Sequence, residues 1–105
     1  MAFTNRNVCK SFSVASASMS QAPTGKVRLA DQECSEVIVL SHATQGSIIY
    51  DDNNPTVGFW CPLHEEMVFR GLTNSNQLSV CRVNSVADGD LNYRTQFFSN
   101  FPEPR

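Results

Sequence analysis

Short runs of apolar residues, each alternating with polar residues and ending at a turn cluster, follow one another along the chain after residue 25. In the run Met67–Arg70, Met67 and Phe69 fall on one face of a strand, and Val68 and Arg70 on the other. A period of two, broken by clusters rich in Gly, Pro and Asn, predicts antiparallel β structure. We expect about seven strands, over residues 27–30, 36–41, 47–50, 57–60, 67–70, 78–83 and 91–97.

The predicted strand over residues 36–41 has the strongest pattern, because it is apolar on both faces. Such a strand is typical of the centre of a sheet that is covered on both sides. No helical crossover is indicated, so the fold class is all-β: a small antiparallel sandwich or jelly roll. The residues expected in or near its core are Ile38, Leu40, Ile49, Phe59, Trp60, Phe69, Leu78, Val80, Leu91, Tyr93 and Phe97.

Residues 1–25 differ from the rest, because Ser residues alternate with small apolar residues up to Pro23 and Gly25. We expect an N-terminal arm over 1–25, extended or partly disordered, and a single β domain over 26–105. The alternation at 12–15 could add an edge strand. Two interpretations stay open for the arm: a tail without a role, or a segment that orders on a neighbouring subunit. Its apolar residues favour the second, and they are Phe3, Val8, Phe12 and Val14.

Composition narrows the class of function. Charged residues make up 17% of the chain and the net charge is -2, whereas soluble domains carry about 25% charged residues. No basic stripe favours nucleic acid or an anionic membrane. No apolar run approaches the ~20 residues that span a bilayer, and the N-terminus lacks the apolar stretch of a signal peptide. The sequence therefore predicts neither a nucleic-acid partner, nor a membrane partner, nor secretion.

The four cysteines are Cys9, Cys34, Cys61 and Cys81, and their spacing is wide. A structural zinc site needs close ligand pairs, which are missing from the sequence. Two disulfides remain possible, although a chain without a secretion signal is expected in a reducing compartment. We expect Cys81, and with it Cys34, to serve as small buried apolar residues.

No catalytic set is evident. His42 and His64 lie in different predicted loops, and no serine has the G-x-S-x-G surroundings of a hydrolase nucleophile. Cys61 stands close to His64 in sequence, but chain neighbours seldom have the orientation that a thiolate pair requires. We therefore expect a protein that is not an enzyme and that holds no metal and no cofactor.

Surplus aromatic residues suggest contacts with other subunits. Phe59 and Trp60 are adjacent in a strand, so they point to opposite faces, one to the core and the other to an interface. Phe98 and Phe101 follow the last inward-facing aromatic residue and need cover elsewhere. The alternative is a local cluster over a sheet edge. The predicted partner-binding residues are Phe3, Val8, Phe12, Val14, Trp60, Phe98 and Phe101.

About half of the chain, from residue 36 to 93, resembles small β-sandwich structural proteins of tailed bacteriophage virions. The matching segments are Gly46-Ser47-Ile48-Ile49-Tyr50, Gly58-Phe59-Trp60-Cys61-Pro62, Leu63-His64-Glu65-Glu66 and the run 72–78. His64 stands where that family often has Gly in its Pro-x-Gly-Glu turn.

The resemblance implies a capsid decoration (cement) protein, a homotrimer that binds the major capsid protein on the outer surface of the virion. Such a protein is made in the host cytoplasm and placed on the phage head, where its arm reaches neighbouring subunits. One alternative is a tail, baseplate or head-fibre module. The other is a small cupin-like enzyme.

Overall fold

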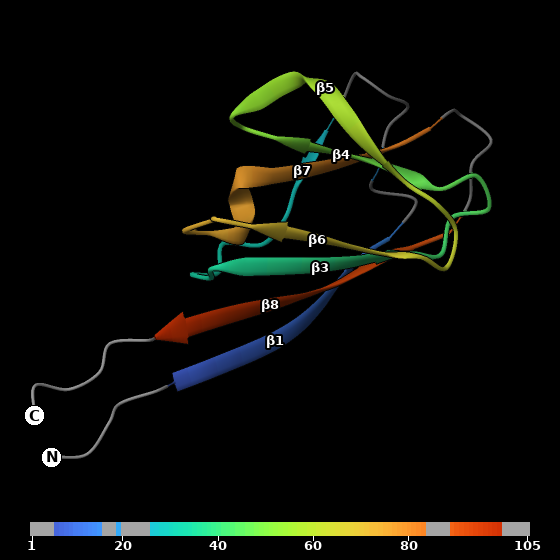
Figure 1. The fold of residues 1–105 in the computed structure, drawn as a ribbon. Helices are drawn as coiled ribbons and strands as arrows, with labels where there is room; N and C mark the ends of the chain where they lie inside the picture. Colours follow the sequence, from blue (N-terminus) through green and yellow to red (C-terminus); the bar gives the residue numbers. More distant parts are fainter. Residues whose placement is uncertain (1–5, 16–18, 20–25, 84–88, 100–105) are drawn as a thin grey trace, which may run out of the picture.

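In the described part of the chain, eight strands form two antiparallel sheets that pack face to face (Figure 1). The computed structural model describes residues 6–15, 19, 26–83 and 89–99. Sheet A has the order β1-β8-β3-β6 and sheet B the order β2-β7-β4-β5. The strands are β1 Arg6–Val14, β2 Val27–Arg28, β3 Glu36–Ser41, β4 Ser47–Asp51, β5 Asn54–Cys61, β6 Glu66–Arg70, β7 Leu78–Arg82 and β8 Leu91–Ser99, with a short 3-10 turn, η2, at Ser75–Gln77.

The winding of the chain is that of a jelly roll. β1, β3, β6 and β8 enter sheet A while β2, β4, β5 and β7 enter sheet B, so the chain crosses repeatedly between the layers. This order of eight antiparallel strands in two sheets is the jelly-roll arrangement. The predicted all-β sandwich is confirmed, with eight strands where the pattern indicated seven.

The extra strand, β1, lies within the segment predicted as an arm. It pairs with β8 along its whole length, from Arg6 opposite Ser99 to Val14 opposite Leu91. On its inner face the Phe12 ring stacks on the Tyr93 ring with centroids 5.2 Å apart. The edge strand foreseen at 12–15 therefore forms on the chain's own sheet and begins earlier. The division of the chain at residue 25 stays a prediction.

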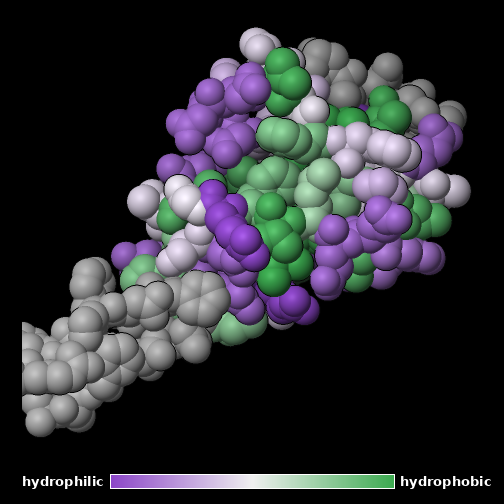
Figure 2. Space-filling view, viewed as in Figure 1, coloured by the Kyte–Doolittle hydropathy of each residue, from purple (hydrophilic) through white to green (hydrophobic). Residues whose placement is uncertain are grey.

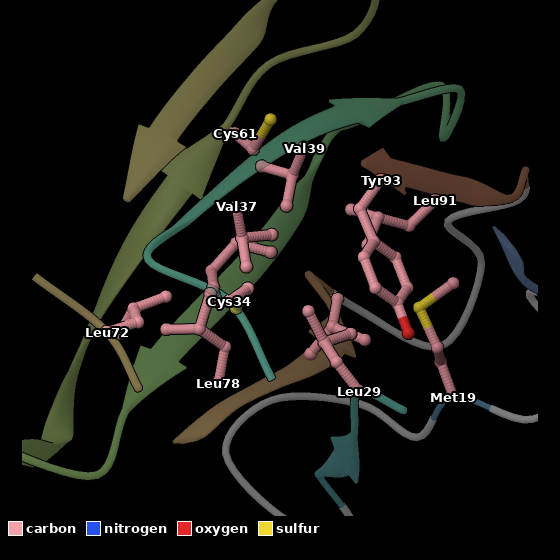
Figure 3. Close-up of a cluster of buried hydrophobic side chains, with 12 residues drawn as sticks. Met19, Leu29, Cys34, Val37, Val39, Cys61, Leu72, Leu78, Leu91 and Tyr93 are labelled. Carbon is pink, nitrogen blue, oxygen red and sulfur yellow. The ribbon is translucent and has the colours of Figure 1, made fainter. Parts of the chain in front are cut away.

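The core lies between the sheets and consists mainly of aliphatic side chains (Figure 3). Ile49, Leu78, Val80, Leu91 and Tyr93 are buried as predicted. The predicted burial of Cys81 and Cys34 is also confirmed, and Cys61 is buried with them. All four cysteines are free thiols.

The position of β3 in the structure differs from the prediction about which of its residues are buried. Val37 and Val39 point inward and are 0% exposed, whereas Ile38 and Leu40 are half-buried on the outer face of sheet A. Both faces of this strand are apolar, so alternation alone could not tell which one is inner. The expectation that both faces are fully covered was wrong, because the second layer packs on one side of the sheet.

β5 corrects the prediction about the aromatic residues. Phe59 is 43% exposed and Trp60 is 55% exposed, although both were expected in or near the core. The physical reason is position: β5 is the outer strand of sheet B and has β4 as its neighbour on one side. Trp60 shares the outer face of sheet B with Ile48, and Phe59 points inward at the end of the sheet, beside which no further described strand lies.

Two turns shape the connections between the strands. Gly46 has φ +84, a left-handed conformation that suits glycine, and it ends the turn between β3 and β4. Asn74 begins η2 with a capping box, and its side-chain oxygen also accepts the N–H of Gln32 at 3.1 Å. The turn predicted over residues 73–76 is therefore the point that holds the β2–β3 connection against sheet B.

Candidate interaction surface

Large hydrophobic side chains are exposed on β5, on the loop that follows it and on β6, which are outer strands of sheets B and A. Those exposed among the described residues are Val57, Phe59, Trp60, Leu63 and Val68. The first three lie on β5, Leu63 lies in the following loop, and Val68 lies on β6. In the view of Figure 2 hydrophobic surface gathers in the middle of the molecule, with hydrophilic residues on both sides. Patches of this kind mark contact sites.

Trp60 is held in a fixed position although more than half of it is exposed. It pairs with Ile48 across β4 and β5, so it faces away from the core. Its indole N–H donates to the carbonyl of Gln45 at 3.0 Å. Gly46 leaves room for the indole, because a Cβ at that position would overlap Trp60. The ring is therefore ordered before any partner arrives, which lowers the entropy that binding must remove.

Phe59 closes the gap between the two sheets at the same side. It pairs with Ile49, so it points toward the inner layer. Its ring and the Phe69 ring of β6 form a T-shaped contact, with centroids 5.7 Å apart and planes at 73°. This edge-to-face contact joins the outer strands of sheets A and B. The remaining exposed part of Phe59 belongs to the apolar surface.

The outer face of sheet A carries a shallow hollow of about 430 Å³. Ile38 and Leu40 are among the apolar residues that line it, and Ser11, Asn92 and Arg94 are among the polar ones. The guanidinium of Arg94 lies 3.9 Å from the carboxylate of Glu66. A hollow lined by apolar residues with a few polar groups is a candidate binding site.

The two histidines come together at the end of the sandwich where β3 ends and β6 begins. The rings of His42 and His64 are both exposed, with centroids 5.7 Å apart. The backbone N–H of His42 donates to Asp90 at 2.7 Å, and that of His64 donates to Ser41 at 2.8 Å. Sequence reasoning placed these residues in separate loops and missed their proximity. Among the described residues no group of three or more His, Cys, Asp and Glu side chains could hold a metal ion.

The buried thiols are unsuited to nucleophilic chemistry. Burial raises the pKa of Cys61 above its ordinary value of 9.0, although a hydrogen bond from the Ser41 backbone partly offsets this effect. The thiol donates to the carbonyl of Glu65 at 3.4 Å. Burial likewise raises the pKa of Cys34 and Cys81. The thiolate is the reactive form, so these residues are held in their unreactive state near neutral pH.

The predicted partner-binding residues have different positions. Trp60 is exposed on β5, whereas Phe12 and Val14 are half-buried against the chain's own core. Val8 and Phe98 are paired in β1 and β8 with Phe97 and Asn7. Phe3 and Phe101 lie outside the described residues. A partner-binding role stays a prediction for all seven.

Comparison of the sequence with models of known protein families and with curated proteins gives no match. In the described part of the chain, no helix is long and apolar enough to cross a membrane. Fold and surface chemistry therefore supply the observations on which a function can be argued.

Proposed function

We propose that this protein is a structural component of an assembly rather than an enzyme, and specifically a decoration protein on the capsid of a tailed phage. One observation carries the proposal: Val57, Phe59, Trp60 and Leu63 are exposed within seven residues of β5 and its following loop. An isolated domain gains nothing from exposing so many apolar side chains along a free edge. A partner protein would cover them.

The chemistry of this surface suits protein–protein contact. Trp and Phe are enriched at the centres of interfaces and carry much of the binding energy there. Burial of apolar area contributes about 25 cal/mol per Å² before the cost of association is subtracted. β5 carries no charged side chain, so docking on it leaves no charge without a partner.

The resemblance to phage virion proteins supports the capsid as the assembly and the major capsid protein as the partner. A decoration protein that contacts several capsid subunits adds interface at each joint. Rupture of the shell then requires several contacts to break together, so modest individual affinities produce a large gain in resistance. The site of action would be the outer surface of the virion.

Two other functions use specific features of the chain. A tail, baseplate or head-fibre module would use the same apolar surface, and copy number per particle separates it from a decoration protein. A cupin-like enzyme is favoured by the jelly-roll order together with the approach of His42 to His64. Metal analysis of the purified protein tests that candidate.

The decisive experiment is co-sedimentation with empty shells assembled from the major capsid protein encoded in the same genome. We expect saturable binding at a fixed ratio, and at least tenfold weaker binding for Trp60→Ser. The control is Thr56→Ala, on the same strand and also exposed. Failure of the wild-type protein to bind such shells would refute the capsid role. Unchanged binding by Trp60→Ser would remove β5 from the interface.

The predicted arm needs a more careful deletion than residues 1–25. Because β1 is a full strand of sheet A, that deletion would remove nine paired residues. Deletion of residues 1–5 leaves β1 whole and tests whether the preceding segment contributes to shell binding.

A further inference from the structure

β6 has an open edge whose residues are complementary to a second copy of the same strand. In sheet A the described strands place β3 on one side of β6 and no strand on the other. The sequence of β6 is Glu66-Met67-Val68-Phe69-Arg70, with opposite charges at its two ends and three apolar residues between them. Val68 is 45% exposed.

The backbone of β6 presents alternate residues to this open edge. The carbonyl of Ser41 accepts a hydrogen bond from His64 on the β6 side, while the N–H of His42 donates to Asp90 on the β8 side. Successive residues of a strand point their N–H and C=O groups to opposite sides. The odd-numbered residues of β3 therefore bond to β6, with Val37 opposite Phe69 and Val39 opposite Met67. The N–H and C=O groups of Glu66, Val68 and Arg70 therefore point away from β3.

We infer that β6 pairs antiparallel with β6 of a second copy about a two-fold axis at Val68, which joins the two A sheets into one eight-stranded sheet. In this register Glu66 of each copy faces Arg70 of the other, and Val68 faces Val68. The residues directly opposite are those whose backbone groups point across the edge. An isologous contact of this kind closes with two copies.

Charge selects this register over its neighbours. The outward-pointing backbone groups stay opposite each other only when one β6 strand slides along the other by two residues or a multiple of two. A shift of two places Val68 opposite a charged residue. A shift of four places Glu66 opposite Glu66, or Arg70 opposite Arg70, and like charges opposite each other destabilise a sheet.

In the proposed dimer, an apolar row on the outer face of sheet A continues into the second copy. Ile38 is paired with Val68 on one side and with Arg94 on the other. The half-buried Ile38 and the exposed Val68 of one copy then form one row with Val68 and Ile38 of the second copy. Glu36 already pairs with Arg70 at 2.8 Å, so rows of alternating charge flank this apolar stripe on both sides.

β5, the long outer strand of sheet B, lacks these features. β5 has no charged side chain to set a register, and it contains Pro55, which cannot donate a hydrogen bond. A second copy therefore fits β6 better than β5. The contact does not depend on which assembly the protein binds, and it gives a dimer in place of the trimer that the resemblance implies.

Sedimentation equilibrium of the full chain tests the dimer. Because the contact spans five residues, we expect a dissociation constant of the order of 100 μM and a dimer of twice the 11.7 kDa chain mass at high concentration. Glu66→Arg alone and Arg70→Glu alone should each weaken self-association about tenfold or more, because each places like charges opposite each other twice.

Mixing the two variants gives the sharpest result. In the mixed dimer both facing pairs of end positions would again carry opposite charges: two arginines on the strand of one copy would meet two glutamates on the other. An equimolar mixture should therefore associate as the wild-type protein does. Val68→Pro is a further variant, because it removes an N–H that points to the open edge and leaves the bonds to β3 in place. Circular dichroism confirms that each variant is folded.

Three results with the wild-type protein and the charge variants would overturn the inference, and a fourth comes from Val68→Pro. They are a wild-type protein that stays monomeric at about 1 mM, a trimer as the associated species, and a mixture of the charge variants that associates no better than either variant alone. If Val68→Pro is folded and dimerises normally, the contact lies elsewhere.

Discussion

β3 and β5 look alike in sequence and differ sharply in the structure. Each contains four consecutive residues with little polar character, Val37–Leu40 in one and Val57–Trp60 in the other. β3 lies between β8 and β6, and its Val39 is 0% exposed. β5 is an outer strand, and its Val57 is 57% exposed.

The difference shows that apolar content and burial are separate properties of a strand. Apolar, β-branched and aromatic residues make a segment extended in both cases. Burial then depends on how many strands flank the segment and on what packs over it. In β5 the last residue, Cys61, is buried, and the seven before it are exposed or partly exposed.

The largest expected effect comes from making the same substitution in both strands. Val39→Ala removes two buried methyl groups and leaves a cavity, so we expect the free energy of unfolding to fall by about 2–3 kcal/mol. Val57→Ala should change it by no more than about 0.5 kcal/mol. Urea denaturation of the two variants and the wild-type protein measures both values.

Equal losses for the two variants would mean that β5 is covered in solution. In that case the comparison should be repeated over a range of protein concentrations, because association hides exposed surface. A lower free energy of unfolding for Val39→Ala alone would support the difference in burial between β3 and β5.

The buried end of β5 supplies a second test, through pH. Burial raises the pKa of Cys61 in the folded state above 9.0, so the unfolded state loses this proton first. The contribution to stability is complete below pH 9 and is lost as pH rises through the folded-state pKa. We expect the free energy of unfolding to decline above pH 9, and less steeply in Cys61→Ala. Urea titrations at pH 7–10 measure the two slopes.

A thiol reagent gives the matching kinetic result at neutral pH. Cys9 is exposed, whereas Cys61 and the two other cysteines are buried. We expect one thiol to react promptly and three to react after unfolding. Prompt reaction of Cys61 would show that the end of β5 opens readily.

The smallest effect is expected at the turn that joins β4 to β5. The guanidinium of Arg28 lies 2.9 Å from the carboxylate of Asp52, and the two side chains are 58% and 48% exposed. Asp52→Asn should cost at most about 1 kcal/mol. In 1 M salt, where the screening length is about 3 Å, the variant and the wild-type protein should converge. A difference that persists in 1 M salt would indicate that Asp52 acts through hydrogen bonds instead.

Much of the fold follows from local pattern. The predicted strands at residues 36–41, 47–50, 67–70 and 91–97 match β3, β4, β6 and β8 closely, because alternation and turn residues are local signals. Leu91 and Tyr93 are buried as expected, and Thr95 is buried with them. Polar residues alternate with them on β8, so the inner face could be identified there and not on β3.

The errors concern long-range pairing. Phe59 and Trp60 were placed in or near the core, with one of them also expected at an interface, because the sequence does not reveal which strand is outermost. The proximity of His42 and His64 was not predicted, because it depends on the pairing of β3 with β6. An antiparallel pairing brings the end of one strand to the start of the other. Had that pairing been predicted, the two loops would have been placed together.

β8 lies between β1 and β3, and this position governs how sheet A can form. In the described chain β1 pairs with β8 alone, more than seventy residues later in the sequence. β1 therefore has no strand to pair with until β8 has docked. Closing so long a stretch carries an entropic cost before any pairing is gained, which slows folding. Until then the apolar edge of β3 is open to strands of other chains, so the interval before β8 docks is when the protein is most exposed to misassembly.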